Sequence, residues 1–357
     1  MALLPLLYPS FCGSTAGSPA ARDTSVKPKY DGIFARILCM VSLLALIPAG
    51  ADATQNPAEL KPAAIVYFNS GSAIDADHAS MIGSMVKEAS STLGVAVRDY
   101  PLPSETGLSE QIEKIADSDV GLIVIVEPHD TEALAKLPSL YPDIRFTVIG
   151  ASRPLYLTNV RSIAFKESEG VFMMGALAAL ESKSGTVSFL AKENNNVSRN
   201  LAYAFLQGTQ HANADVQILE QLGKDNTRRT TGAAPKETNA DIVFVLDEEL
   251  LDNALRNARN KKQLVITCNH ALTGAYPGVV LTSLVNHYDL ALYHTLHSYR
   301  RGIWRSGSET MGIGNSYIDY ALDADNRKLI PKETVEQIET VKDFVSQGII
   351  QISALAQ

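Results

Sequence analysis

The stretch FKESEGVFMMGALAALESKSGTVSFL, residues 165–190, reads as a strand end, a helix and a second strand. Glu167 and Glu169 fall in or beside the first helical turn, where the helix dipole favours acidic side chains. An apolar stripe follows at helical spacing: Val171, Met174 and Ala178. Gly175 costs a helix interior about 1 kcal/mol relative to alanine. We therefore predict that another segment packs closely against this glycine and offsets its cost.

Outward from this stretch, continuous apolar runs alternate with runs of helical periodicity. The apolar runs predict strands within residues 63–68, 95–102, 120–128, 145–150, 185–191, 215–222, 240–249, 263–271 and 279–286. The intervening runs predict helices within 81–94, 108–118, 130–142, 200–213 and 249–262. Strands that are apolar on both faces and alternate with helices indicate parallel sheets covered on both sides. The fold class is therefore α/β, and a split near residue 163 gives two doubly wound lobes.

Ligands of doubly wound sheets bind in the crevice outside the carboxyl ends of the strands. Two such lobes in tandem direct those ends toward one shared crevice. The loops that follow the predicted strands are therefore the places where binding residues are expected. These loops are 69–78, 127–130, 150–153, 192–199, 247–249, 268–270 and 286–287.

The N-terminal region differs from the rest of the chain. Basic residues precede the apolar run ILCMVSLLALIPAG, which ends in the small-residue sequence Ala-Gly-Ala-Asp-Ala. This pattern predicts a leader at residues 1–53 with a secretory signal peptide, cleaved after Ala51 or Ala53. The alternative is a membrane anchor, but the apolar run is much shorter than the ~20 residues that span a bilayer. Translation beginning further into the chain is a second alternative, because the leader is long before its charged part.

Charge and cysteine content limit the possible partners. Lys and Arg total 31 against 39 Asp and Glu, and the formal net charge is −8. Nucleic acid is not an expected partner, because phosphate binding needs a concentrated basic face. Of the three cysteines, only Cys268 lies beyond the leader, so the mature chain has no internal disulfide. No cysteine stands at the cleavage junction to carry a lipid, and we expect a soluble periplasmic or otherwise exported protein that is peripheral to the membrane.

The opening stretch resembles the signature of the basic membrane protein family, the Bmp or Med-like substrate-binding lipoproteins of ABC transporters. The shared pattern is a strand-end Phe, a Glu-Gly pair, a Gly five residues on, an Ala-Ala pair and a Lys-x-Gly-x-Val-x-Phe strand. Here these are Phe165, Glu169-Gly170, Gly175, Ala178-Ala179 and 183–189. The similarity continues on both sides, through YPDIRFTVIG and AYAFLQGTQHAN, and extends over about residues 62–350.

The resemblance implies a type I periplasmic-binding fold with an interlobe cleft and a three-strand hinge. Lobe 1 is then 54–163 plus about 284–310, and lobe 2 is 164–283 plus about 311–357. It also implies capture of a small-molecule ligand, a purine nucleoside in the better understood members, and delivery to ABC permease subunits. Capture works by closure of the lobes around the ligand. No catalytic residue and no cofactor is implied.

The family's ligand residues are mostly replaced in this chain. Phe68 stands where the first strand usually ends in an aspartate, and Ala76 and Leu201 replace two aromatic residues that stack on the base. Cys268 replaces the aspartate that holds the ribose, and Asn286 replaces a lysine. Stacking contributes ~1–3 kcal/mol per base, so these losses weaken nucleoside binding unless other residues compensate. The candidate binding residues are Phe68, Asn69, Asp75, Asp77, Asn195, Arg199, Asp247, Cys268, Asn269 and Asn286.

Each remaining cluster of polar residues can be explained by a structural role as well as by a functional one. The asparagines of KENNNVSRN, with Arg199, can hydrogen-bond to a polar ligand. Alternatively, they only form a turn and cap the next helix. His294 and His297 lie one helical turn apart, but no carboxylate or cysteine completes a metal site, and none is predicted. Cys268 and His270 lack an orienting group and an oxyanion site, and we predict no enzyme activity. GSETMGIGNS, 307–316, reads as a surface turn with a short strand.

Two functions therefore remain open. The first is an exported solute-binding protein of an ABC import system that captures a small polar ligand, nucleoside-like at best. The second is a scaffold that has kept the fold without the family ligand and acts as a periplasmic or surface interaction protein.

Overall fold

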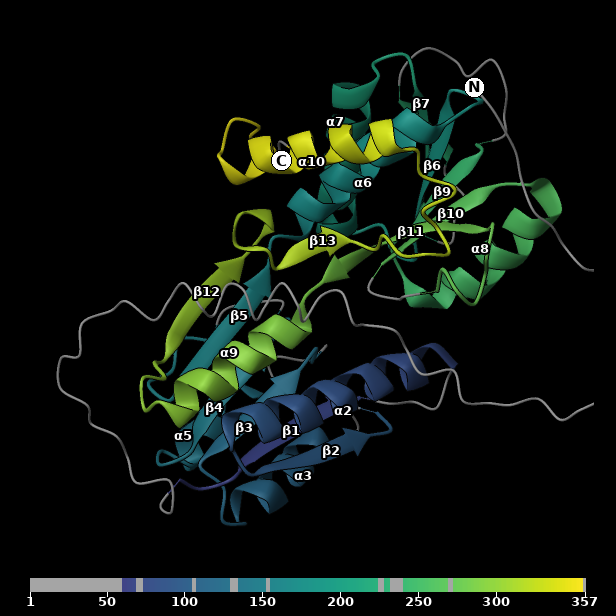
Figure 1. Cartoon of the computed structure of the whole chain (residues 1–357). Coiled ribbons are helices and arrows are strands. Elements are labelled where there is room, and N and C mark those ends of the chain that lie inside the picture. The colour runs from purple at the N-terminus through teal and green to yellow at the C-terminus, as the bar shows by residue number, and fades with distance from the viewer. Residues whose placement is uncertain are drawn as a thin grey trace, which may run out of the picture. The chain divides into compact units, whose positions relative to one another are not determined.

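The computed structural model describes residues 60–68, 73–104, 107–128, 134–151, 155–223, 228–231, 240–268 and 272–355. All of them belong to one unit of the chain, Thr54–Gln357. The signal peptide predicted at residues 1–53 lies outside the described residues. Two sheets, with helices on both faces of each, organise the described part (Figure 1). The predicted α/β class is thus confirmed.

The first sheet has six parallel strands in the order β12-β5-β4-β3-β1-β2. Their bounds are β1 Ala63–Phe68, β2 Val97–Leu102, β3 Leu122–Val126, β4 Arg145–Ile149, β5 Val160–Phe165 and β12 Gly307–Met311. Side chains of α2 (Ala73–Leu93) and α9 (Tyr288–Arg300) pack on one face. Helix α3 (Leu108–Ala116) packs on the other face, and the short α5 spans Leu137–Leu140.

The second sheet has seven strands in the order β13-β11-β10-β9-β6-β7-β8. Their bounds are β6 Thr186–Ala191, β7 Gln217–Leu222, β8 Arg228–Thr231, β9 Ile242–Val245, β10 Leu264–Cys268, β11 Val280–Asn286 and β13 Ile318–Tyr320. The two edge strands, β8 and β13, are antiparallel to their neighbours. Helices α6 (Glu167–Glu181), α7 (Asn196–Ala212) and α10 (Lys332–Ser346) pack on one face. Helix α8 (Glu248–Lys261) packs on the other.

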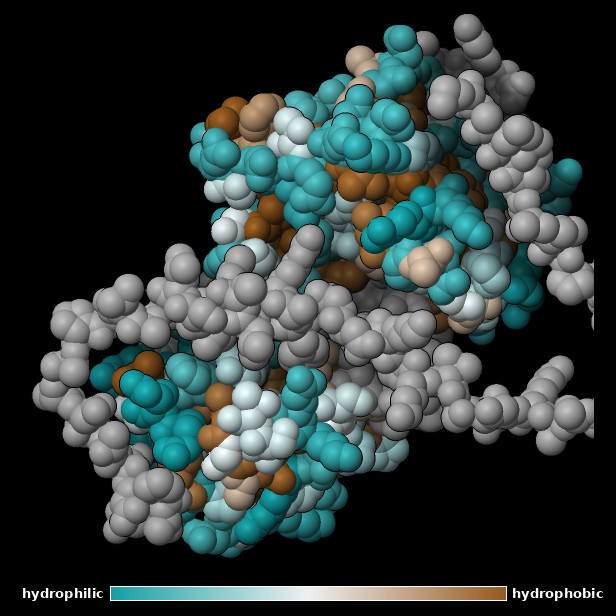
Figure 2. Space-filling model, in the orientation of Figure 1, coloured by the Kyte–Doolittle hydropathy of each residue, from teal (hydrophilic) through white to brown (hydrophobic). Residues whose placement is uncertain are grey.

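Amphipathic sequence explains how the outer helices cover the second sheet. In α10 the side chains of Ile338, Val341 and Val345 are buried at helical spacing, while most of the intervening residues are exposed. Figure 2 shows mainly hydrophilic residues along this helix. The apolar stripe therefore faces the core, as a 3.6-residue period requires.

Gly175 has the close neighbour that the sequence predicts. A β-carbon added there would lie 2.2 Å from the Phe205 carbonyl oxygen of α7, and one added at Gly208 would lie 1.9 Å from the Phe172 carbonyl oxygen of α6. The Thr209 hydroxyl donates to the Gly175 carbonyl at 3.3 Å and to the Phe205 carbonyl at 2.9 Å. The two helices thus cross backbone to backbone, and the contact offsets the helix cost of both glycines.

The segment 307–316 has a larger part in the fold than the predicted surface turn. Its strand β12 forms the edge of the first sheet and pairs in parallel with β5, followed by the 3₁₀ turn η1, Ile313–Asn315. The Arg161 guanidinium of β5 contacts the Glu309 carboxylate of β12 at 2.9 Å. The prediction of a short strand is right, but the pattern gave no sign of its partner.

The chain passes between the two sheets three times, at β5 to α6, β11 to α9 and β12 to η1. We call these residues the crossing segments: 165–167, 286–288 and 311–313. They place the ends of β5 and β11 next to the starts of α6 and α9. Of the predicted binding residues, Asn286 lies in the second of these segments.

Candidate functional site

Several of the predicted binding residues cannot be placed. Asn69 and Asn269 lie outside the described residues. Asp75 and Asp77 belong to α2, but their side chains are not among the described ones. The stretches that follow β1, β3, β4 and β10, at 69–72, 129–133, 152–154 and 269–271, also lie outside the described part. The site can therefore be built only from the strand ends themselves and from the crossing segments.

Asn195 and Arg199 make local contacts at the start of α7. The Asn195 carboxamide oxygen accepts from the Ser198 backbone N–H at 2.9 Å, and the Ser198 hydroxyl accepts from the Asn195 N–H at 3.1 Å, which forms a capping box. The Arg199 Nε donates to the Asn194 side chain at 2.7 Å. These contacts match the simpler interpretation of the asparagine run, in which it makes a turn and caps a helix.

Asp247 joins the carboxyl ends of two neighbouring strands. It follows β9, and its carboxylate accepts from the Lys192 backbone N–H, directly after β6, at 2.7 Å. Burial raises the pKa of this carboxyl, although the Lys192 N–H and ammonium oppose the rise. Asp247 is thus placed at the expected edge of the sheet, with one acceptor already engaged.

Phe68, Cys268 and Asn286 end three parallel strands. Phe68, the last residue of β1, is partly buried and packs against the apolar cluster between α3 and the first sheet. Cys268 ends β10 and packs against the core of the second sheet. Burial, together with the negative charges of Glu167 and Asp247, raises the pKa of the Cys268 thiol. A thiol held in its neutral form is not an activated nucleophile.

Three residues outside the predicted set meet at the junction: Glu127, Glu167 and Tyr288. The Tyr288 hydroxyl hydrogen-bonds with the Glu127 carboxylate and with the Asn286 side chain. Tyr288 is 5% exposed, and its ring packs edge-on against Phe165 with centroids 4.9 Å apart. Burial and the two glutamates raise the pKa of the Tyr288 hydroxyl well above its ordinary value. The phenol therefore stays protonated and can donate to Glu127.

The backbone of Glu127 adopts a conformation that is unusual for a residue with a side chain. Its φ is 51°, in the left-handed region, which costs about 1–2 kcal/mol for a non-glycine residue. The next strand end, Gly150, leaves room for this side chain, because a β-carbon there would lie 3.2 Å from the Glu127 Cγ. The conformation directs the carboxylate toward Tyr288, and strain of this kind clusters at functional sites.

Glu167 is both accessible and desolvated. Its side chain is exposed to solvent, yet burial of its surroundings, followed by the charge of Glu127, raises the pKa of its carboxyl. Among the described residues Glu167 has no hydrogen-bond or ion-pair partner, and the adjacent Lys166 ammonium binds Glu169 instead, at 3.0 Å. Glu167 is thus available to accept from a ligand.

The sequence contained weak signals for two of these three residues. Glu127 directly follows a fully apolar strand, within a loop where binding residues were expected. Glu167 was interpreted only as an acidic residue at a helix start, and no sequence pattern singled out Tyr288. Tyr288 lies 121 positions after Glu167 and 161 positions after Glu127, and local sequence patterns do not predict contacts over such separations.

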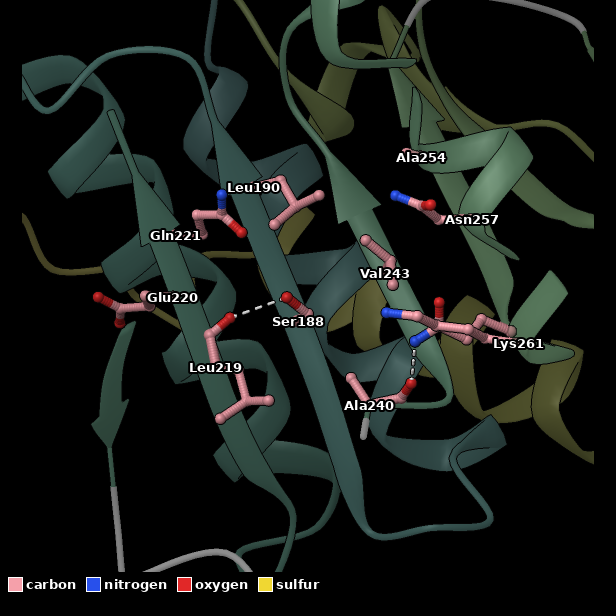
Figure 3. Close-up of a pocket in the computed structure, with 11 residues that line it drawn as sticks. Ser188, Leu190, Leu219, Glu220, Gln221, Ala240, Val243, Ala254, Asn257 and Lys261 are labelled. Carbon is pink, nitrogen blue, oxygen red and sulfur yellow. Dashed lines mark hydrogen bonds between the residues drawn. The ribbon is translucent and has the colours of Figure 1, made fainter. Parts of the chain in front are cut away.

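One well-formed hollow lies elsewhere. It has a volume of about 200 Å³ on the face of the second sheet that α8 covers (Figure 3). Ser188, Leu219 and Val243 form its floor, and Asn257 and Lys261 of α8 flank it. The Ser188 hydroxyl donates to the Leu219 carbonyl at 3.0 Å. Because it opens on a sheet face and not at the strand ends, we assign the candidate site to the glutamates and Tyr288.

The histidines of α9 are engaged with aromatic side chains. His294 Nδ1 bonds with the Tyr317 hydroxyl, and the His297 ring stacks on Tyr293 with centroids 6.2 Å apart. In the part of the chain that the structure describes, no group of three His, Cys, Asp or Glu side chains is arranged to hold a metal ion. Within the same residues, no helix has both the length and the apolar character to cross a membrane.

Comparison with known proteins gives consistent results. Residues 65–355 match the model of the Bmp family, described as ABC transporter substrate-binding protein PnrA-like. An uncharacterized lipoprotein of Pyrococcus abyssi is 22% identical over 333 residues, covering 88% of this chain and 82% of that protein. Basic membrane protein A2 of Borrelia garinii is 26% identical over 253 residues, covering 67% and 73%.

Among solved structures, a solute-binding protein of an ABC transporter system from Aeropyrum pernix K1 is similar in fold. Its TM-score is 0.66 at 17% identity, and the alignment covers 83% of this chain and 94% of that one. At this identity the likeness shows the fold, the periplasmic-binding fold of solute-binding proteins, and no more.

Proposed function

Because the chain belongs to the Bmp family of PnrA-like ABC transporter substrate-binding proteins, we propose that it captures a small polar ligand where its crossing segments meet the strand ends. The observation that carries the proposal is the accessible, desolvated Glu167 beside the Glu127–Tyr288 hydrogen bond. A carboxylate is costly to keep in such a place without a partner. A ligand that donates hydrogen bonds would supply one.

The chemistry of these groups favours a ligand rich in donors. Glu167 accepts hydrogen bonds, and Glu127 can accept further ones beside that of Tyr288. Hydroxyl groups of a sugar and N–H groups of a heterocycle both meet this need, so a nucleoside-like solute is our first choice. A hydrogen bond from a ligand hydroxyl to a carboxylate contributes about 1.5–3 kcal/mol.

Delivery to a permease requires export. We propose that residues 1–53 act as a signal peptide and that the mature protein works in the periplasm or outside the cell, peripheral to the membrane. Lobe closure around the ligand would present both lobes to the ABC permease subunits. Neither step requires a cofactor or catalysis.

A thermal-shift panel of purine and pyrimidine nucleosides, free bases, ribose and amino acids tests the proposal on the full chain. A ligand at one hundred times its Kd adds about 2.7 kcal/mol to the free energy of unfolding. We expect at least one nucleoside to raise the melting temperature, and Glu167→Gln to reduce that shift. Glu113→Gln, which alters an exposed acidic residue of α3, serves as the control. Absence of any shift across the panel would remove the support for ligand capture.

A second function, the scaffold without ligand, has its own supporting observations. Leu201, at a family stacking position, is 6% exposed in the core, and Phe68 packs into an apolar cluster. Asn195 and Arg199 are used in local contacts. A null panel together with a normal unfolding transition would favour this function.

A further inference from the structure

Glu169, the acidic residue of the family signature, links two crossing segments that lie far apart in sequence. It sits in the first turn of α6, and its Oε2 accepts from the Ile313 backbone N–H at 2.9 Å, across 144 positions. Its Oε1 contacts the Lys166 ammonium at 3.0 Å. The side chain is only 15% exposed. One carboxylate thus joins the start of α6 to Ile313, the first residue of η1.

The Glu169 carboxylate packs directly against Gly312, so a side chain at that position would have to displace it. A β-carbon at Gly312 would lie 2.3 Å from Glu169 Oε2 and 3.0 Å from the Lys166 Cδ. The backbone of the same two segments is also joined, because the Lys166 N–H donates to the Met311 carbonyl at 2.7 Å. The first and third crossing segments are therefore held together by backbone and side chain.

The second crossing segment is attached to the third through Tyr317. The His287 N–H donates to the Tyr317 carbonyl at 2.8 Å, and the Tyr317 N–H donates to the Gly312 carbonyl at 3.1 Å. Phe165 contacts the rings of both Tyr288 and Tyr317, at 4.9 and 6.5 Å between centroids. A displacement at Gly312 therefore reaches His287 and Tyr288 through contacts that do not include Glu169.

From this geometry we infer that Glu169 is a positioning residue for ligand capture: its carboxylate couples the three crossing segments and thereby holds Glu167 and Tyr288 in place. The inference rests on the proposed function for its effect on binding, but the coupling itself is a property of the ligand-free protein. Glu169 is not expected to touch the ligand, because both of its oxygens are engaged within the protein.

Glu181 offers a matched control on the same helix. It lies in the last turn of α6 and accepts from the Thr334 hydroxyl of α10. Both helices pack on the second sheet, so this bond joins no crossing segments. Removing the Glu181 carboxylate deletes the hydrogen bond from Thr334, and removing the Glu169 carboxylate deletes the one from Ile313 together with the local contact to Lys166. Only the Glu169 bond spans the junction.

Hydrogen–deuterium exchange of the ligand-free full chain tests the coupling. In Glu169→Ala we expect exchange to become faster by roughly tenfold both at Ile313 and at the His287 and Tyr317 amides, which Glu169 does not contact. Glu169→Gln keeps an oxygen for the Ile313 N–H and should restore protection. Glu181→Ala should leave these amides unchanged. Faster exchange confined to Ile313, or an equal effect in Glu181→Ala, would show that Glu169 makes only a local bond and would overturn the inference.

Adenosine titration by calorimetry tests the effect on the site. We expect Glu169→Ala to weaken binding by roughly tenfold, with Glu169→Gln and Glu181→Ala within about threefold of the unaltered protein. Equal affinity in all four proteins would contradict the positioning role. If the unaltered protein does not bind adenosine, that result counts against the proposed nucleoside ligand, while the exchange experiment still decides the coupling.

Discussion

Glu127 and Glu167 place two carboxylates at the junction of the crossing segments, and their charges oppose each other. The raised pKa of Glu167 has burial as its main cause and Glu127 as its second. Binding proteins commonly keep such groups because the ligand, and not the protein, compensates them. The same arrangement costs stability when no ligand is present.

Glu167→Gln should therefore stabilise the ligand-free protein at neutral pH. A carboxyl whose pKa is raised in the folded state contributes stability at pH values below its ordinary pKa, and that contribution is lost as the pH rises through the folded pKa. The amide has no charge to desolvate, so we expect a melting temperature higher by on the order of 2 °C at pH 7. Melting curves from pH 4 to pH 8 check this.

The gain should shrink toward pH 4, where Glu167 is protonated in both states. Glu113→Gln, at an exposed position of α3, provides the comparison for a general effect of removing one negative charge. A gain that is the same at every pH, or a loss of stability at pH 7, would contradict the electrostatic account of Glu167.

The contact between helices α6 and α7 was predicted from the sequence in part: its existence was expected, but its partner was not. The cost of Gly175 and the small residues around it indicated a close neighbour, and the neighbour exists. Its identity could not be deduced, because Gly208 lies in an ordinary amphipathic run and the crossing depends on both helices lying on the same sheet face. The small residues of α6 predict that a close contact occurs, but the partner helix is known only from the fold.

Gly208→Ala should destabilise the protein strongly, although alanine is the better helix former. Its methyl group would meet the Phe172 carbonyl oxygen at 1.9 Å, a backbone atom that cannot rotate away. Overpacking of this kind costs about 1–3 kcal/mol. The loss in the free energy of unfolding can be measured by urea denaturation.

Gly83→Ala in α2 is the matched control, since the nearest atom to the added carbon is the Tyr67 hydroxyl at 3.8 Å. There we expect a gain of about 0.5–1 kcal/mol from helix propensity. If the two substitutions changed the free energy of unfolding equally, α6 and α7 would be able to move apart and accommodate the added methyl group.

Strands with both faces buried were predicted from their apolar runs, whereas edge strands were predicted unevenly: β2 and a short strand at β12 were expected, and β8 and β13 were not. The central strands β1, β3 and β9 are continuous apolar runs, and all of their residues except the last of β1 are buried. Edge strand β12 alternates mostly exposed polar residues, so its pattern resembles a turn. What fixes it is pairing with β5 and the Arg161–Glu309 ion pair, which are contacts across 148 positions.

The first sheet and its helices come from two separate parts of the chain, whereas the second comes from the later part alone. This difference affects where the limits of the two lobes lie. The second sheet and its helices come from residues after 165. One apolar cluster of the first sheet includes side chains from far later in the chain: Tyr288, Ala291, Leu292, Leu296, Tyr299, Met311 and Tyr317. We propose on this basis that the first lobe is completed by about residues 284–310 and cannot form from the N-terminal half alone. The proposed site has the same dependence, because Glu127 hydrogen-bonds with Tyr288 from the later segment.

Separate fragments should reveal the asymmetry. Residues 54–165 alone lack α9 and β12, so their sheet would leave one apolar face uncovered, and we expect no cooperative urea transition by near-ultraviolet circular dichroism. Residues 166–357 contain every described strand and helix of the second sheet and should unfold cooperatively. Mixing the two should restore an aromatic signal from Phe165, Tyr288 and Tyr317 that neither fragment gives alone. A cooperative transition for residues 54–165 alone would show that the later segment is dispensable for the first lobe. If mixing did not restore the aromatic signal, the crossing segments would have to be covalently continuous to assemble.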